Sequence, residues 1–237
     1  MTGRVSARSA VTRPPTRWGR WLERLLLVFP VVVGAGVVAV LADAPVPAVR
    51  WTVLSGVALA ALCIRLGIPV FLFLDARALN RSAVTWEPNR WLYAGAALFV
   101  SAPLVALVYL YRRFKHVPPA TGAGPWAARW WTAVALAAVL GPLAFVVGLV
   151  GTVAAVGTVL AVATTVAAGL LPVGIYRDAS YVRAADTSWN PNPAWYLALA
   201  FLSLLVVVLQ PVLAAWYLGT RYGTFRAVRA GSRPDRL

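Results

Sequence analysis

Residues 130–176 have the sequence WWTAVALAAVLGPLAFVVGLVGTVAAVGTVLAVATTVAAGLLPVGIY, a stretch without a single charged side chain. Its 47 residues would form a helix of about 70 Å, whereas the hydrocarbon core of a bilayer is about 30 Å thick. The stretch must therefore fold back on itself, and the segment Gly148-Leu149-Val150-Gly151 is the predicted turn. Two membrane helices joined by a tight hairpin follow, at 130–148 and 152–176.

Outward from this stretch, further windows of about 20 mostly apolar residues have the length of a membrane-crossing helix. The chain of 237 residues is 61% hydrophobic and only 12% charged, so it lacks the polar side chains that cover a water-soluble domain. The apolar runs are continuous rather than alternating, which excludes a membrane β-barrel. The predicted fold is an all-α polytopic membrane bundle of six transmembrane helices, at 25–42, 51–74, 91–111, 130–148, 152–176 and 194–218.

The sequence contains an internal duplication. A shift of 103 residues superposes DARALNRSAVTWEPNRWLY (75–93) on DASYVRAADTSWNPNPAWY (178–196) without a gap. After a five-residue insertion, SAPLVALVYLYRRF (101–114) matches LQPVLAAWYLGTRY (209–222). Identities include Asp75/Asp178, Trp86/Trp189, Pro88/Pro191, Asn89/Asn192, Tyr93/Tyr196, Pro103/Pro211, Tyr109/Tyr217 and Arg113/Arg221. Two copies of one three-helix unit are therefore predicted.

The repeat defines the predicted organisation of the chain: a basic tail (1–20), unit one (21–117), a linker (118–125), unit two (126–222) and a second basic tail (223–237). In each unit W-x-P-N precedes the third apolar segment. Proline suits the first turn of a helix, so we interpret W-x-P-N as a helix start with Trp at the interface, in preference to a ligand-binding loop.

The Asp-led linker, W-x-P-N and the ending YLYRRFKHV (109–117) resemble uncharacterised multi-pass membrane proteins of haloarchaea. The resemblance covers the second half of each unit, about half of the chain. It implies an archaeal membrane protein and implies no activity.

An odd number of spans in each unit predicts that the tandem copies enter the membrane in opposite directions, as inverted repeats. In the cell membrane, with both termini cytoplasmic, 14 Lys and Arg residues lie inside and seven outside, as the positive-inside rule favours. The basic cluster 112–115 falls outside and fits this orientation worst. An alternative for the N-terminus is a secretory signal cleaved near Ala42-Asp43-Ala44, although Pro45 would hinder cleavage and the repeat requires the first helix.

Four polar residues are candidates for a pathway or a partner site. Arg65 is the only charge within a predicted span, so it is either functional or snorkels to the interface. Asp75 and Asp178 occupy equivalent helix ends, where the simplest expectation is a solvated carboxylate paired with nearby arginines, and the sharper one a pair of gates. Gln210 is a polar group within the last span. Thr164, Thr165 and Ser203 are expected to bond backbone or a neighbouring helix.

The composition also excludes several functions. Cys63 and His116 are each the only residue of their type, so we expect no metal site, no cofactor and no disulfide. No phosphate loop or catalytic motif is present, which argues against an enzyme. The formal charge of +15 points to anionic lipid headgroups at the Arg-rich tails rather than to nucleic acid. A structural, regulatory or partner-binding membrane protein is predicted, and a small secondary transporter or channel-like permease is the alternative.

Overall fold

A computed structural model describes residues 16–41, 47–82, 84–117, 127–150, 154–185, 189–206 and 208–231. Every regular element in these ranges is helical, so the all-α prediction is confirmed for this part of the chain. The candidate cleavage site, Ala42-Asp43-Ala44, lies outside the described residues. The elements are α1 (Arg17–Leu41), α2 (Pro47–Asn80), α3 (Arg90–Phe99), α4 (Ala102–Arg113), η1 (Ala127–Arg129), α5 (Trp131–Val150), α6 (Ala154–Ala184), α7 (Pro193–Leu205) and α8 (Leu209–Gly231).

Three of these helices are long and apolar enough to cross a membrane, which indicates a membrane protein. They comprise residues 17–40 of α1, 50–80 of α2 and 156–184 of α6. α5 and α7 contain shorter apolar segments. Many large apolar side chains point outward from these helices, among them Leu59, Leu62 and Val159, as expected of surfaces that face lipid rather than water.

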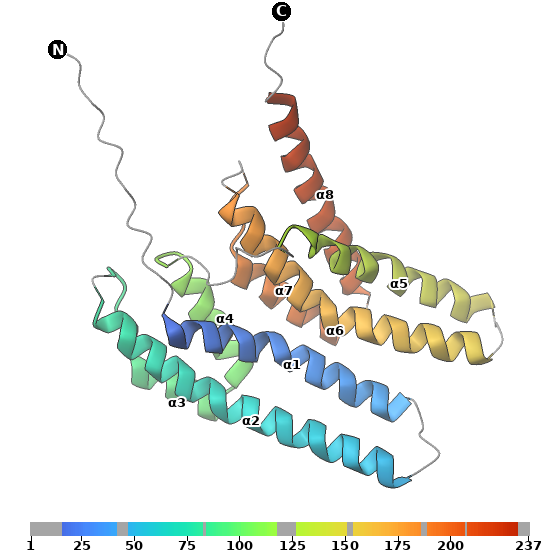
Figure 1. Cartoon of the computed structure of the whole chain (residues 1–237), viewed down its shortest axis with the longest axis horizontal. Helices are drawn as coiled ribbons and strands as arrows, with labels where there is room; N and C mark the ends of the chain where they lie inside the picture. The colour runs from blue at the N-terminus through green and yellow to red at the C-terminus, as the bar shows by residue number, and fades with distance from the viewer. Residues whose placement is uncertain are drawn as a thin grey trace, which may run out of the picture.

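The four long helices α1, α2, α5 and α6 lie side by side (Figure 1). α1 is antiparallel to α2, because Trp18 contacts Phe71 near one end and Gly36 approaches Val57 near the other. α6 is also antiparallel to α1, since a Cβ added at Gly169 would lie 3.4 Å from the Pro30 carbonyl oxygen and one added at Gly34 would lie 4.0 Å from the Thr165 carbonyl oxygen. Helices α2 and α6 therefore run in the same direction.

The third apolar segment of each unit is not one helix. The predicted helices 91–111 and 194–218 are each divided in two, into α3 and α4 and into α7 and α8. The backbone is extended at Ser101 (φ −164°, ψ 114°) and at Val206 (φ −129°, ψ 92°). α3 has ten residues and is about 15 Å long, too short for a bilayer. The prediction of six continuous helices is wrong at these two segments.

Each divided segment forms a helical hairpin that enters and leaves at one end of the bundle. α3 begins with Trp91 against Phe73 of α2, their ring centroids 4.8 Å apart. It ends beside Arg65, where Val100 and Ser101 line a common cavity with that residue. α4 then returns until Arg113 reaches Asp75. We call α3 and α4 the first hairpin, and α7 and α8 the second hairpin.

The hairpins change the topology that an odd number of spans predicted. With two long helices and one returning hairpin, each unit begins and ends at the same end of the bundle. The two units therefore point the same way, as α2 and α6 do, and the predicted inversion is wrong (Figure 1). The cluster 112–115 lies at the same end as the start of α1, because Arg113 faces Glu23. Its predicted place on the opposite side from the N-terminus is wrong for the same reason.

Proline alone does not explain where the helices divide. Pro103 lies in the first turn of α4, where its missing N–H leaves no hydrogen bond unmade. Pro30, Pro69, Pro142 and Pro172, however, lie inside continuous helices. The division therefore depends on packing as well as on the residue type.

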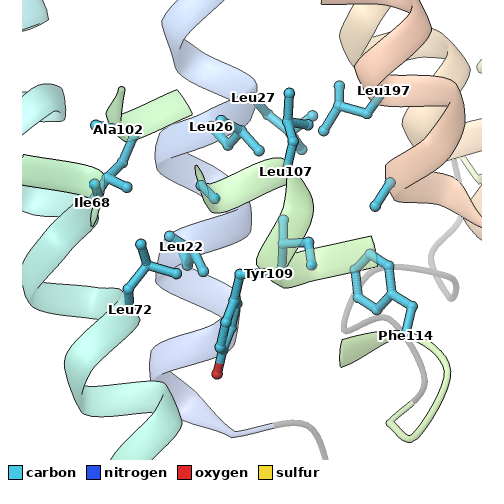
Figure 2. Packing of buried hydrophobic residues seen from close by; sticks show 14 of the residues in the cluster. Leu22, Leu26, Leu27, Ile68, Leu72, Ala102, Leu107, Tyr109, Phe114 and Leu197 are labelled. Carbon is cyan, nitrogen blue, oxygen red and sulfur yellow. The ribbon is translucent and has the colours of Figure 1, made fainter. Parts of the chain in front are cut away.

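The core is made where α1, α2, α4 and α7 meet. Figure 2 shows Leu22 and Leu26 of α1, Leu72 of α2 and Leu107 of α4 packed together, with the hydroxyl of Tyr109 pointing away from the leucines. A second apolar core joins α5, α6, α7 and α8. The two apolar clusters fix each hairpin against its long helices.

Segment 151–169 is rich in glycine, alanine and threonine, and such small residues favour close helix packing in membranes. Where α6 is described, a Cβ added at Gly169 would lie 3.4 Å from the Pro30 carbonyl oxygen of α1, so the contact with α1 is close. Thr164 donates to the Leu140 carbonyl of α5 (3.4 Å), and Thr165 and Ser203 donate to carbonyls of their own helices. The predicted bonding of these hydroxyls is confirmed.

Candidate functional site

A buried cluster joins the first hairpin to α2. The Tyr109 hydroxyl donates to Oδ2 of Asp75 (2.7 Å), and Nε of Arg113 donates to the same oxygen (2.9 Å). Tyr109 and Arg113 are four residues apart on α4, a spacing that places both on one face of the helix. All three side chains are inaccessible to solvent. We call Asp75, Tyr109 and Arg113 the first cluster.

Two further residues contact the first cluster: Glu23 of α1, and Thr16, which directly precedes α1. The Thr16 hydroxyl donates to Oδ1 of Asp75, and Nη1 of Arg113 lies 3.6 Å from Oε1 of Glu23, which is also buried. Burial by itself lowers the pKa of Arg113, but the charges of Asp75 and Glu23 raise it above its usual value. The guanidinium therefore stays charged between two carboxylates.

Unit two repeats the arrangement at the residues that the duplication pairs with these. The Tyr217 hydroxyl donates to Oδ2 of Asp178 (2.8 Å), and Nε of Arg221 donates to the same oxygen (2.8 Å). We call Asp178, Tyr217 and Arg221 the second cluster.

The second cluster is less complete than the first. The Arg221 side chain is 17% exposed, whereas that of Arg113 is fully buried. Oδ1 of Asp178 is buried and accepts no hydrogen bond from the described residues. The same carboxylate oxygen of Asp75 has Thr16 as its donor. The two clusters share their ion pair and tyrosine but differ in how far the rest of the carboxylate is satisfied.

Aromatic rings close over both tyrosines in the same way. The Tyr109 ring centroid lies 5.3 Å from that of Trp86 and 5.0 Å from that of Tyr93. In unit two, the centroid of Tyr217 lies 5.5 Å from that of Trp189 and 5.2 Å from that of Tyr196. Such tilted and edge-to-face contacts stabilise aromatic pairs beyond their buried area. The Trp of each W-x-P-N sequence therefore covers a cluster.

The asparagine of W-x-P-N caps the helix that follows. Oδ1 of Asn89 accepts from the backbone N–H groups of Trp91 and Leu92 (both 3.1 Å). Oδ1 of Asn192 accepts from the N–H of Ala194 (3.1 Å). Asn is among the preferred N-cap residues because its side chain satisfies an otherwise unpaired N–H. A helix start at each W-x-P-N is therefore confirmed, but Pro88 and Pro191 precede the N-cap asparagines and lie outside the first turn, where the proline was expected.

The ion-pair partners differ from those expected along the sequence. Asp75 and Asp178 were expected as solvated carboxylates beside neighbouring arginines, but both are fully buried. Their partners are Arg113 and Arg221, 38 and 43 residues away. The signal was present, because the duplication pairs Tyr109 with Tyr217 and Arg113 with Arg221 at the same four-residue spacing. What it could not show was that each hairpin returns to the end where the aspartate lies.

The other two candidates lie near the hairpin tips. Arg65 is exposed on α2 and lines a cavity of about 530 Å³ with Ser101 and Pro103 at the tip of the first hairpin. Gln210 is buried in the first turn of α8, at the tip of the second hairpin. The structure does not bring these two together with the aspartates: Asp75 of α2 contacts α4 at Tyr109 and Arg113, and Asp178 of α6 contacts α8 at Tyr217 and Arg221.

The two clusters are buried polar contacts that hold the helices together. Each aspartate holds a tyrosine and an arginine of the returning helix, and the described residues contain no group of three His, Cys, Asp or Glu side chains that could hold a metal ion. Comparison of the chain with protein-family models, curated proteins and solved structures found no match.

Proposed function

We propose that the protein is a multi-pass membrane protein in which α1, α2, α5 and α6 cross the bilayer and the two hairpins are re-entrant. The duplication, together with the matching clusters and helix caps, supports two copies of one unit in parallel orientation. From Trp51 to Asp75 is about 36 Å of helix, enough to cross the hydrocarbon core. Arg65 and the tip of the first hairpin then lie near the middle of the bilayer.

The distribution of charge supports one orientation of this arrangement. Fourteen described basic side chains lie at or beyond the end that carries the clusters, whereas Arg50 lies at the other end and Arg65 between them. We call the end with the clusters the basic end. Under the positive-inside rule the basic end faces the cytoplasm, together with both termini. The residues of the 112–115 cluster, which fitted the inverted arrangement worst, then fit this rule.

The function that this arrangement supports best is non-catalytic: a rigid membrane scaffold that binds partners or lipid at its basic end. The observation that carries the proposal is that each buried aspartate, on a long helix, binds a tyrosine and an arginine of a hairpin. Proton- or sodium-coupled carriers commonly use carboxylates within the membrane for coupling. In this protein the three buried carboxylates of the described residues are already engaged: Asp75 and Asp178 each accept from an arginine and a tyrosine, and Glu23 faces Arg113.

One observation favours a permease as the second candidate. Arg65 and the first turn of α4 line the same cavity, and half-helix ends near the midplane bind substrates in several transporter folds. From the resemblance to haloarchaeal membrane proteins we also propose an archaeal source. The resemblance implies no activity.

Cysteine labelling tests the topology. Ser82 and Ala185 are counterparts under the 103-residue shift, and both lie at the basic end. In a Cys63→Ala background, Ser82→Cys and Ala185→Cys should react with an impermeant thiol reagent from the cytoplasmic side, and Arg50→Cys from the other side. Reaction of positions 82 and 185 from opposite sides would restore the inverted arrangement.

Ion flux through liposomes separates the two functions. Vesicles containing the purified full-length protein should release iodide, potassium and glycerol no faster than vesicles without protein. Faster release of iodide that disappears in Arg65→Leu would replace the scaffold with an anion permease. Arg77→Leu is the matched control, because it removes an exposed arginine from the same helix, α2, outside the cavity.

A further inference from the structure

An apolar groove runs between the two units, from the basic end toward the hairpin tips. It encloses about 720 Å³, and the described residues that line it belong to α4 and α7. The two helices are antiparallel there, since Tyr111 and Trp195 face each other at one end of the groove, their ring centroids 6.3 Å apart. Leu104 and Leu205 line the other end.

The length of the groove fits one leaflet of a bilayer. From Ala194 to Leu205, α7 rises about 17 Å, close to half of a hydrocarbon core of about 30 Å. Its side chains are leucine, valine, alanine and phenylalanine, and an aromatic pair lies at the interfacial end. Trp and Tyr prefer the headgroup level, so the groove extends from the headgroups toward the midplane.

Two cations follow closely on Tyr111, the residue of α4 at the interfacial end of the groove. Nζ of Lys115 lies 4.7 Å from the Tyr111 ring centroid. Arg112 is next to Tyr111 in the chain, and its Nη1 lies 3.5 Å from the hydroxyl of Tyr93 on α3. Both side chains are exposed, and the remaining donors of Arg112 are available to a phosphate. None of the four carboxylates in the described part of the chain lines the groove.

We propose that this groove binds one anionic phospholipid, with an acyl chain against Phe201 and Leu202 and its phosphate at Arg112 and Lys115. A zwitterionic lipid fits the groove less well, because its headgroup adds a positive charge beside two cations. The proposal rests on the re-entrant arrangement above, which places the groove within one leaflet. The site is separate from both clusters and from the basic tails.

Native mass spectrometry of the full-length protein in detergent tests the proposal. With phosphatidylglycerol and phosphatidylcholine added in equal amounts, the wild type should keep one phosphatidylglycerol in preference. Each basic residue near an anionic lipid contributes roughly a factor of five, so Arg112→Gln with Lys115→Gln should weaken retention about thirtyfold. Ala198→Trp, which fills the groove, should lose both lipids.

The matched control removes the same charge elsewhere at the basic end. Arg77→Gln with Arg81→Gln should retain phosphatidylglycerol as the wild type does, because neither residue lines the groove. Glycerol phosphate, which has no acyl chain, should not compete at millimolar concentration. Competition by it would reduce the site to an anion contact without the groove and overturn the proposal.

Three other results overturn it: equal retention of the two lipids by the wild type, equal losses in the two double variants, or a dimer that Ala198→Trp converts to a monomer. The last result would make a second copy of the chain the occupant. The labelling of positions 82 and 185 keeps this test distinct from the topology. If positions 82 and 185 label from one side but the protein shows no lipid preference, only the lipid site is overturned. If the two positions label from opposite sides, both the lipid site and the proposed topology are overturned.

Discussion

Replacement of Asp75 by asparagine tests whether the first cluster holds the hairpin in place. The change keeps the size of the side chain but removes the charge opposite Arg113, which has no access to solvent. Breaking a buried ion pair by removing one partner costs about 3–5 kcal/mol, because it leaves a buried charge without compensation. Glu23 remains 3.6 Å from Arg113 and offsets part of this cost. We therefore expect a loss of about 3 kcal/mol.

The matched control is Asp178→Asn in the second cluster. The Arg221 side chain is 17% exposed, so water or lipid headgroups can solvate it when the carboxylate is lost. The expected cost is about 1–2 kcal/mol, because a partly exposed ion pair contributes less than a buried one. Because both variants replace an aspartate paired with an arginine, the difference between their free energies of unfolding measures the effect of burying the arginine.

Unfolding of the purified protein by a denaturing detergent, followed by tryptophan fluorescence, gives the two free energies of unfolding. The double variant Asp75→Asn with Arg113→Met should be about 2 kcal/mol more stable than the sum of the single changes, because it removes both charges of the pair. Asp75→Asn within 0.5 kcal/mol of the wild type, or a larger loss from Asp178→Asn, would refute the reasoning.

The remaining predictions concern single contacts and use the same unfolding measurement. Tyr217→Phe should cost about 2 kcal/mol and Tyr109→Phe about 1 kcal/mol, because the carboxylate of the second cluster has fewer donors in the described residues; a larger loss from Tyr109→Phe would contradict this. Asn89→Ala should cost about 1 kcal/mol through loss of the cap, and no change would show that the cap is not needed. Arg65→Leu should leave stability unchanged or raise it, because the proposed arrangement places Arg65 near the midplane, where an arginine costs about 2.5–3.5 kcal/mol. A loss of stability would show that the Arg65 side chain makes a stabilising contact.

The sequence by itself determined the class of the protein and the local starts of its helices. The charge-free segment 130–176 required two antiparallel helices because of its length, and the structure has α5 and α6 there. W-x-P-N predicted helix starts from its proline, and the structure adds that the asparagine is the N-cap; both act within one turn of chain. Both are local effects, which depend on residues close together in the sequence.

Only the tertiary structure decided how each third segment lies and, with it, the direction of unit two. Residues 91–111 are apolar and long enough to cross a bilayer. Pro103 lies just after the break between α3 and α4, whereas Pro69 lies inside the continuous helix α2, so the presence of a proline does not show which segment is divided. The alternative, a hairpin that returns to Asp75, depends on an ion pair between residues 38 apart and on the packing of α4 against α1 and α2. Such contacts form only after the helices have assembled, so hydropathy and proline placement cannot show whether a segment crosses the bilayer or turns back within it.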